Sequence, residues 1–478
     1  MELTALPDDA LVAVMQLLDV RDLLSCRLAC RRLGELALHP DAWRRRALDL
    51  FPDSVRCICP MLRLAPCALS MHVEFPGSLW RHGDTSSAEA ITTSKCAVNI
   101  LRVLVDEHCG VLDAKALILQ QHSLGRLKEL RLYLLCNRQQ DESLLLRTVA
   151  SMPSLERLWI VTSGKDRKPT PIPTRLRITP SLKSFACDSG KNWPFIHRML
   201  SRHAATLETV LVSGLRTPLS IVPLVTGMPN LTSLKCDCSP GIKGILGAAS
   251  LRELHLVITS FGGRGAEAAD VTAAADGVLE AAELLRRAEH LRAVTLEYTP
   301  ALFCTEVFGA DLVLALASSG RSRLETLCIE DYGGVRPSGF PQLQPLVSAL
   351  PGLPSLLHLK VAADADIASE LLSAISPASA PALQSVELPL RGRRAHTWLH
   401  GDAVKAAFSA NPSLHIKMRF PLCGDDDCET CELARHHEPL SRRSHNQKSN
   451  LGLFSHDPKE KCLQGHSSDR PWVRVPVT

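Results

Sequence analysis

A short leucine pattern that recurs along most of the chain constrains the fold more than any other feature of this sequence. The pattern Leu-x-x-Leu-x-Leu, with other apolar residues allowed at its three positions, occurs ten times between residues 127 and 388. Its first positions are Leu127, Leu155, Leu182, Leu207, Leu231, Leu251, Leu291, Leu324, Leu356 and Leu383. All but one of the intervals between these leucines fall between 20 and 33 residues, and the remaining interval is 40 residues. A chain with this period stacks similar short units on one another.

Each unit combines a strand with a helix. The apolar positions alternate as in a strand, and helical stretches precede several of the strands, at residues 143–152, 195–203, 311–318 and 367–375. The pattern resembles the leucine-rich repeat, whose usual period is ~20 to 29 residues. That resemblance implies an α/β fold in which residues 96–420 form a leucine-rich-repeat solenoid, a horseshoe with strands inside and helices outside. Ten occurrences in register disfavour the alternative of an ordinary α/β domain with a chance leucine pattern.

Three segments depart from the period. Residues 49–95 show no sustained repeat, and we expect a linker that packs on the array. The 40-residue interval carries an insertion at residues 261–288, in which a glycine-rich turn precedes an alanine-rich helix. No Lys-Ser or Lys-Thr follows these glycines, so the segment is not a phosphate-binding loop. Residues 414–420 alternate with period two and predict a terminal capping strand.

Residues 1–48 predict a small all-α module. Asp8 and Asp9 follow Pro7 as in the first turn of a helix. An apolar stripe then follows at helical spacing: Leu11, Val14, Met15 and Leu18. A second start signal stands at Asp19, and His39-Pro40 ends the helical pattern. Periodicity alone is equally consistent with a helical cap on the repeats.

The residue identities in this module resemble the F-box. The matching stretches are Leu6 to Asp9, Leu17 to Leu24, Leu28 to Arg32 and His39 to Trp43, and they fit without a gap. Leu33 departs from the family, which often carries an aromatic residue there. The resemblance implies a three-helix unit that docks on a Skp adaptor, and through it on a cullin, a RING subunit and a ubiquitin-charged E2. The expected adaptor-facing residues are Leu6, Pro7, Leu11, Leu17, Leu18, Leu23, Leu24, Leu28 and Trp43.

These resemblances together imply a substrate-recognition adaptor of a Skp/cullin/F-box E3 ubiquitin ligase, whose repeats hold the target protein. We find no catalytic constellation in the sequence and expect a non-catalytic subunit, with the E2 carrying the thioester chemistry. The alternative is a leucine-rich-repeat interaction scaffold whose N-terminal helices fold back on the array. Exposure of the stripe around Leu11, Val14 and Leu18 favours the adaptor, and its burial against the repeats favours the scaffold.

Residues between the recurring apolar positions point to the opposite face of the strands, where a target protein would bind. Exposed aromatic residues beside arginine often anchor interfaces. The alternative is that the linker covers this face. Acidic residues midway along the face favour a basic segment of the target. The expected target-binding residues are Tyr133, Arg157, Trp159, Lys235, His255, Glu297 and Glu330.

The tail, residues 421–478, is polar and rich in Cys and His. Cys423, Cys428, Cys431 and His436 offer the four ligands of a tetrahedral zinc site, although their spacing matches no familiar zinc family. We expect this tail to be largely disordered with incidental cysteines, and the zinc site is the alternative. We expect no cofactor unless the tail binds this zinc.

Composition and charge restrict the remaining function classes. The net charge is only +4, and the basic triplet Arg44–Arg46 is too short for a nucleic-acid footprint, so nucleic acid is not an expected partner. One nucleic-acid function stays open, that of a metal-dependent nucleic-acid binder that acts through the tail. The 17 cysteines are scattered and odd in number, which indicates reduced thiols and a cytoplasmic or nuclear location. We expect neither a signal peptide nor a membrane-spanning segment.

Overall fold

The structure is a computed structural model and describes residues 6–50, 61–75, 85–106, 110–135, 139–162, 178–188, 192–214, 221–259, 268–299, 309–320, 322–331, 340–362, 364–390, 398, 402–421, 448–457, 462, 466, 470 and 472–475. The chain divides into two compact units. Unit 1 comprises residues 1–217 and 227–230, and unit 2 comprises residues 218–226 and 231–478.

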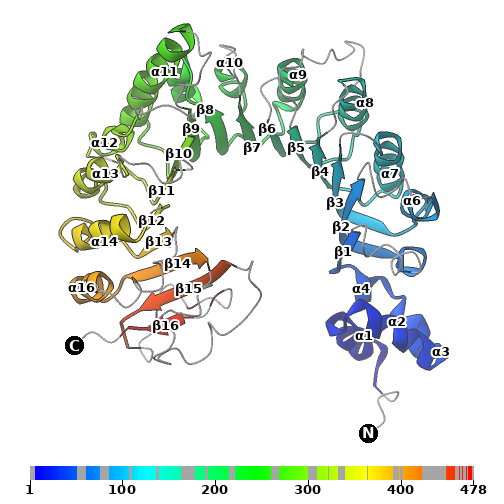
Figure 1. The fold of residues 1–478 in the computed structure, drawn as a ribbon. Coiled ribbons are helices and arrows are strands. Elements are labelled where there is room, and N and C mark those ends of the chain that lie inside the picture. The colour runs from blue at the N-terminus through cyan, green and yellow to red at the C-terminus, as the bar shows by residue number, and fades with distance from the viewer. Residues whose placement is uncertain are drawn as a thin grey trace. The chain divides into compact units, whose positions relative to one another are not determined.

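Unit 1 begins with the helical module, shown in blue in Figure 1. Its helices are α1 (Asp8–Leu17), α2 (Val20–Ala29), α3 (Arg31–Ala37) and α4 (Pro40–Trp43). Asp19 caps α2 by accepting a hydrogen bond from the backbone N–H of Asp22 at 2.7 Å. The Trp43 side chain is fully buried, and its Nε1 donates to the carbonyl of Ala37 at 2.7 Å. The predicted all-α module is confirmed.

Arg46 ties the end of α1 to the start of the sheet. Its guanidinium donates to the carbonyls of Met15 and Leu18, both at 2.7 Å. These carbonyls lie at the C-terminal end of α1, where the regular hydrogen bonds of a helix run out, and the Met15 carbonyl also accepts from the backbone N–H of Leu18. The Arg46 carbonyl in turn accepts from the backbone N–H groups of Leu69 and Ser70. The third arginine of the basic triplet therefore has a structural role.

The rest of unit 1 is a parallel sheet whose strands neighbour one another in chain order. The strands are β1 (Ala47–Leu50), β2 (Cys67–Phe75), β3 (Ala97–Val105), β4 (Glu129–Leu134), β5 (Arg157–Thr162), β6 (Ser184–Asp188) and β7 (Thr209–Ser213). The helices of this part are α6 (Thr85–Thr92), α7 (Val111–Ser123), α8 (Gln139–Ala150) and α9 (Trp193–His203), and they lie together along one face of the sheet (Figure 1).

The leucines of the sequence pattern form the core between these layers. In β4, Leu130 and Leu132 are completely buried, whereas Arg131 between them reaches the opposite face of the strand. Successive repeats also share a backbone ladder. The carbonyl of Lys128 accepts from Glu156 and Arg157, and the carbonyl of Glu156 accepts from the next repeat. The predicted alternation of strands and helices is confirmed, and the assignment to leucine-rich repeats stays a prediction.

The sheet begins earlier than the sequence pattern indicates. Within the segment expected to be a linker, β2 pairs in parallel register with β3, for example Met71 opposite Leu101. Its buried side chains include Ala68 and Met71, and Met71 stands in the row in which β4 carries Leu130, so the leucine pattern does not identify this strand. The segment at residues 49–95 therefore contributes to the sheet itself.

Unit 2 repeats the same plan. Its parallel strands are β8 (Ser233–Asp237), β9 (Glu253–Thr259), β10 (Ala293–Thr299), β11 (Thr326–Asp331), β12 (His358–Val361), β13 (Ser385–Pro389) and β14 (His415–Pro421). Its helices and 3-10 turns are α10 (Val222–Val225), η5 (Ile242–Gly247), α11 (Ala268–Arg287), α12 (Leu312–Ala317), α13 (Leu343–Ala349), η6 (Leu350–Gly352), α14 (Ala365–Ala374) and α16 (Asp402–Ala410). The helix expected in the insertion is α11.

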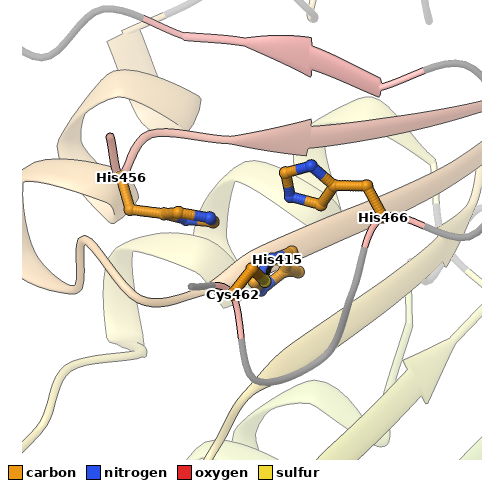
Figure 2. A group of neighbouring side chains, drawn as sticks. All are labelled: His415, His456, Cys462 and His466. Atoms are coloured by element: carbon orange, nitrogen blue, oxygen red, sulfur yellow. Dashed lines mark hydrogen bonds between the residues drawn. The ribbon is translucent and has the colours of Figure 1, made fainter. Parts of the chain in front are cut away.

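Unit 2 does not end at β14. The strand β15 (Lys448–Phe454) pairs with β14 in antiparallel register, and β16 (Trp472–Arg474) pairs with β15. Within the tail, residues 448–454 and 472–474 therefore form strands, whereas most of the segment expected to be largely disordered lies outside the described residues. Three residues of the tail, His456, Cys462 and His466, lie beside His415 of β14 (Figure 2).

No helix among the described residues is long and apolar enough to cross a membrane.

Candidate functional site

The surface of the helical module exposes large apolar side chains. Leu17 at the end of α1 is 87% exposed and Leu28 in α2 is 81% exposed, the two highest values among large hydrophobic residues of the described chain. Val14, one turn before Leu17, is 44% exposed. An exposed leucine is unremarkable singly, but several on one small module indicate a binding surface.

The predicted adaptor-facing residues divide between this surface and the core of the module. Leu11, Leu23 and Trp43 are buried inside the module and present no surface to a partner. Leu6, Leu18 and Leu24 are half-buried, and Pro7, Leu17 and Leu28 are exposed. The division follows from packing, because helices this short need a core of their own before they can present a face to a partner.

On the strand face of unit 1, one carboxylate organises two arginines. Glu129 is buried and accepts from Nε of Arg131 at 2.6 Å and from Nε of Arg157 at 2.7 Å. Burial opposes ionisation of Glu129, but the hydrogen bonds from Arg157 and Arg131 outweigh it and hold its pKa below the ordinary value. Arg131 also lies over the ring of Trp159, with its guanidinium carbon 5.6 Å from the ring centroid.

Three predicted target-binding residues belong to this group or adjoin it. Trp159 is 41% exposed, Arg157 is exposed, and Tyr133 of β4 is half-buried. Because Glu129 fixes both arginines, the aromatic face of Trp159 and the guanidinium groups form a surface that is ordered before any partner binds. The structure thus brings together Arg157 and Trp159, with Arg131 and Glu129 as partners outside the predicted set.

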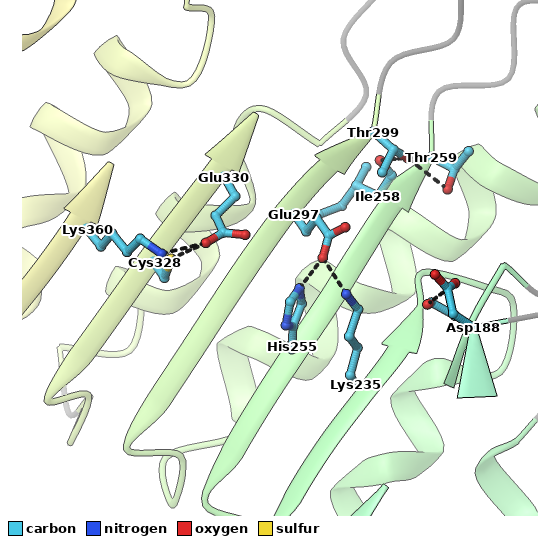
Figure 3. Close-up of polar contacts among 11 residues, drawn as sticks. Asp188, Lys235, His255, Ile258, Thr259, Glu297, Thr299, Cys328, Glu330 and Lys360 are labelled. Carbon is cyan, nitrogen blue, oxygen red and sulfur yellow. Dashed lines mark hydrogen bonds and ion pairs between the residues drawn. The ribbon is translucent and has the colours of Figure 1, made fainter. Parts of the chain in front are cut away.

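On the strand face of unit 2, Glu297 joins two other predicted residues (Figure 3). Its Oε2 accepts from Nζ of Lys235 at 2.6 Å and lies 2.6 Å from Nε2 of His255. Burial raises the pKa of Glu297, but the hydrogen bonds from His255 and Lys235 dominate and lower it to about 2. The carboxylate is therefore ionised throughout the physiological pH range.

A second ion pair lies further along the same face. Glu330 accepts from Nζ of Lys360 at 2.7 Å, and the thiol of Cys328 is 3.6 Å from the same carboxylate oxygen (Figure 3). Burial and the neighbouring Glu330 raise the pKa of Cys328 to about 12. Glu297 and Glu330 are thus each paired with a lysine of the same face, and the expectation that this face favours a basic target segment stays a prediction.

Several thiols in the core of the repeats are poor nucleophiles. Burial raises the pKa of Cys96 and of Cys238 to about 12 in each case, and it also raises the pKa of Cys236 well above its ordinary value. A thiol needs its thiolate form to attack a substrate or bind a metal unaided. These core cysteines therefore pack as small apolar groups.

The metal ligands expected from the sequence, Cys423, Cys428, Cys431 and His436, lie outside the described residues. Within the described residues, a different group could hold a metal ion: His415, His456, Cys462 and His466, whose ligand atoms all lie within 4.8 Å of one another. Sequence spacing did not identify this group, because His415 stands 47 residues before Cys462.

Comparison with known protein families identifies one domain. The family model described as F-box-like matches residues 3–49, which correspond to the helical module. A search among curated proteins finds no significant match to the chain. An F-box-like domain therefore occupies the N-terminal module of this protein. This match supports the interpretation of the chain as an F-box protein.

Proposed function

We propose that this chain is a substrate-recognition adaptor of a Skp/cullin/F-box E3 ubiquitin ligase. The F-box-like domain is consistent with binding to a Skp-type adaptor. The observation that carries the proposal is the exposure of Leu17 and Leu28 on the helical module. Docking removes these side chains from water, and complete burial of one leucine contributes about 1.5 to 3 kcal/mol before the cost of association.

The buried residues of the module support this docking indirectly. Leu11, Leu23 and Trp43 fix the helices against one another, and Arg46 fixes the end of α1 against the start of the sheet. A surface that is already ordered loses less conformational entropy when it binds. Binding by α1 and α2 would therefore use a rigid apolar face.

The repeats would hold the target protein. In our proposal they are leucine-rich repeats, and the first contacts come from the ordered group around Trp159 and Arg157 on the strand face of unit 1. The adaptor links the chain to a cullin, a RING subunit and an E2, which performs the thioester chemistry. The chain itself acts without catalysis, by raising the effective concentration of a target lysine near the E2. Such a complex would work in the cytoplasm or the nucleus.

One observation favours the alternative of a repeat scaffold that recruits no ligase. The helix α4 packs against β2, and the thiol of Cys67 donates to the carbonyl of Pro40 at 3.5 Å. The module thus contacts the first strands of the array. The stripe that distinguishes the two functions is itself divided, since Leu11 is buried in the module, Leu18 is half-buried and Val14 is exposed.

Co-purification with a Skp-type adaptor separates the two functions. The double variant Leu17→Asp, Leu28→Asp places charges on the proposed surface without touching the core. The matched control is Leu112→Asp, Leu279→Asp, because Leu112 in α7 and Leu279 in α11 are 72% and 69% exposed. We expect the wild type and the control to bind the adaptor and the first variant to lose at least tenfold in affinity.

Both variants should keep the circular dichroism of the wild type, because the substituted side chains face solvent. Absence of adaptor binding by the wild type would overturn the ligase proposal and favour the scaffold. Equal loss in both double variants would show that general surface charge, and not the module surface, controls binding.

A further inference from the structure

Four side chains near the C-terminal end of unit 2 converge on one point. His415 is the first residue of β14, His456 follows β15, and Cys462 and His466 lie between β15 and β16 (Figure 2). Their ligand atoms all lie within 4.8 Å of one another. Two stretches of chain far apart in the sequence thus bring three imidazoles and one thiol together.

The distances suit a single small ion. Sγ of Cys462 lies 3.2 Å from Nε2 of His415. The ring centroids of His415, His456 and His466 are separated by 5.1 to 5.6 Å. Neighbouring ligand atoms around tetrahedral zinc are roughly 3.3 to 3.8 Å apart, given Zn–N near 2.1 Å and Zn–S near 2.3 Å. The longest separations would have to shorten by roughly 1 to 1.5 Å, which movement of side chains such as the exposed His466 can supply.

The polar atoms of the cluster are incompletely satisfied. Among the described residues, Nε2 of His456 has no hydrogen-bond partner, although the atom is buried. A buried polar atom without a partner is costly, so such atoms in a fold call for a ligand or an ion. A metal ion bound to Nε2 of His456 would accept its lone pair and remove that cost.

The surroundings are apolar. Trp472 stacks on His466 with ring centroids 4.8 Å apart, and Phe454 packs against the same imidazole at 4.2 Å. Gly452 permits this arrangement, since a Cβ at that position would overlap the Trp472 ring. Aromatic rings around a coordination sphere limit the access of water and hold the ligand rings in place.

We propose that His415, His456, Cys462 and His466 form a structural zinc site that fastens the C-terminal strands to β14. Three imidazole nitrogens and one thiolate suit Zn²⁺, whereas Mg²⁺ and Ca²⁺ require oxygen ligands. Four protein ligands fill a tetrahedron and leave no position for substrate. On binding, the Cys462 thiol gives its proton to solvent and its sulfur coordinates the ion as a thiolate.

The position of the site explains what it would stabilise. The strand β16 has only three residues, and among the described strands it pairs with β15 alone. Such a short strand contributes few hydrogen bonds of its own. A metal held jointly by β14 and by the segment before β16 would cross-link them, and the end of the sheet would be covered.

The test uses the full-length chain, purified without chelator from zinc-supplemented cells. Zinc content per chain is measured by mass spectrometry, and Co²⁺ replacement supplies the absorption of a tetrahedral thiolate site. We expect about one zinc ion per chain in the wild type. The variant Cys462→Ser, His466→Ala should lose it, while Cys462→His, which keeps four donors, should retain it.

Two control variants locate the metal. Cys30→Ser removes an exposed thiol in α2–α3, and Cys428→Ser removes one of the ligands expected from the sequence. Both should keep the zinc and the cobalt spectrum. Zinc that persists in Cys462→Ser, His466→Ala, zinc that is lost in Cys428→Ser alone, or a wild-type chain without zinc would each overturn the assignment.

Discussion

His203 shows how a single buried polar residue fastens two elements of unit 1. It is the last residue of α9, and its Nδ1 accepts from the backbone N–H groups of Ser181 and Leu182 at 3.0 and 3.2 Å. The ring thereby provides a hydrogen-bond acceptor for two backbone N–H groups just before β6. Burial lowers the pKa of His203 from 6.5 to about 4, because the charged imidazole is disfavoured in the core.

This pKa predicts a defined pH dependence. The folded state keeps His203 neutral down to about pH 4, whereas the unfolded chain takes up a proton below pH 6.5. The contribution to the free energy of unfolding is therefore complete above pH 6.5 and is lost as the pH falls from 6.5 towards 4. Over that interval it amounts to about 3 kcal/mol.

The variant His203→Asn isolates this contribution, since its side-chain oxygen can accept the same backbone bonds but does not titrate there. Urea unfolding at several pH values should show the wild type losing more stability than the variant between pH 6.5 and 4. Parallel pH profiles for the two proteins would contradict the assignment of this proton to His203.

At the scale of elements, α7 is bounded at both ends by glycines in the left-handed region. Gly110 precedes the helix with φ of +88°, and Gly125 follows it with φ of +76°. A Cβ at Gly110 would lie 2.5 Å from Cβ of Phe75 at the end of β2, whereas a Cβ at Gly125 would meet nothing within 4 Å. The first glycine thus serves both backbone conformation and close packing.

These two glycines provide a matched pair of variants. Gly125→Ala should cost only the left-handed backbone strain, about 1 kcal/mol. Gly110→Ala should cost that strain and also the displacement of Phe75, about 3 kcal/mol in total. Equilibrium unfolding of both proteins measures the difference, and equal losses would show that β2 and α7 are not packed as described.

The helices and strands predicted from the sequence agree best with the structure where the residues of the element itself determine its conformation. The helix expected at residues 195–203 is α9, Trp193–His203, because its apolar periodicity and Trp-Pro start are contained in the segment itself. The strand β2 was missed because what makes Cys67–Phe75 a strand is its pairing with β3. The strand β15 was missed for the same reason, since it pairs with β14 across residues 422–447.

The candidate sites show the same difference between features set by consecutive residues and features set by contacts between distant segments. The F-box-like module was predicted from consecutive residues, and the family comparison supports it. Which of its leucines are exposed could not be predicted from periodicity, because Leu11 and Leu17 belong to one helix but to different faces of it. The converging donors around His415 were missed because they become neighbours only through the fold.

At the scale of the whole molecule, the chain joins a helical module to strand-and-helix repeats in two units. In our account the module recruits the ligase and the repeats hold the target. Exposed apolar residues sit on the module, and ordered polar groups sit on the strand faces. Each part therefore carries a surface suited to a different partner.

Hydrogen exchange of the full-length chain, measured with and without a purified Skp-type adaptor, tests the central claim most directly. We predict that the adaptor slows exchange in the module, at residues 8–29 of α1 and α2, and leaves the strands of both units unchanged. Protection confined to the repeats, or no protection at a saturating adaptor concentration, would contradict the assignment of this module as the ligase-recruiting surface.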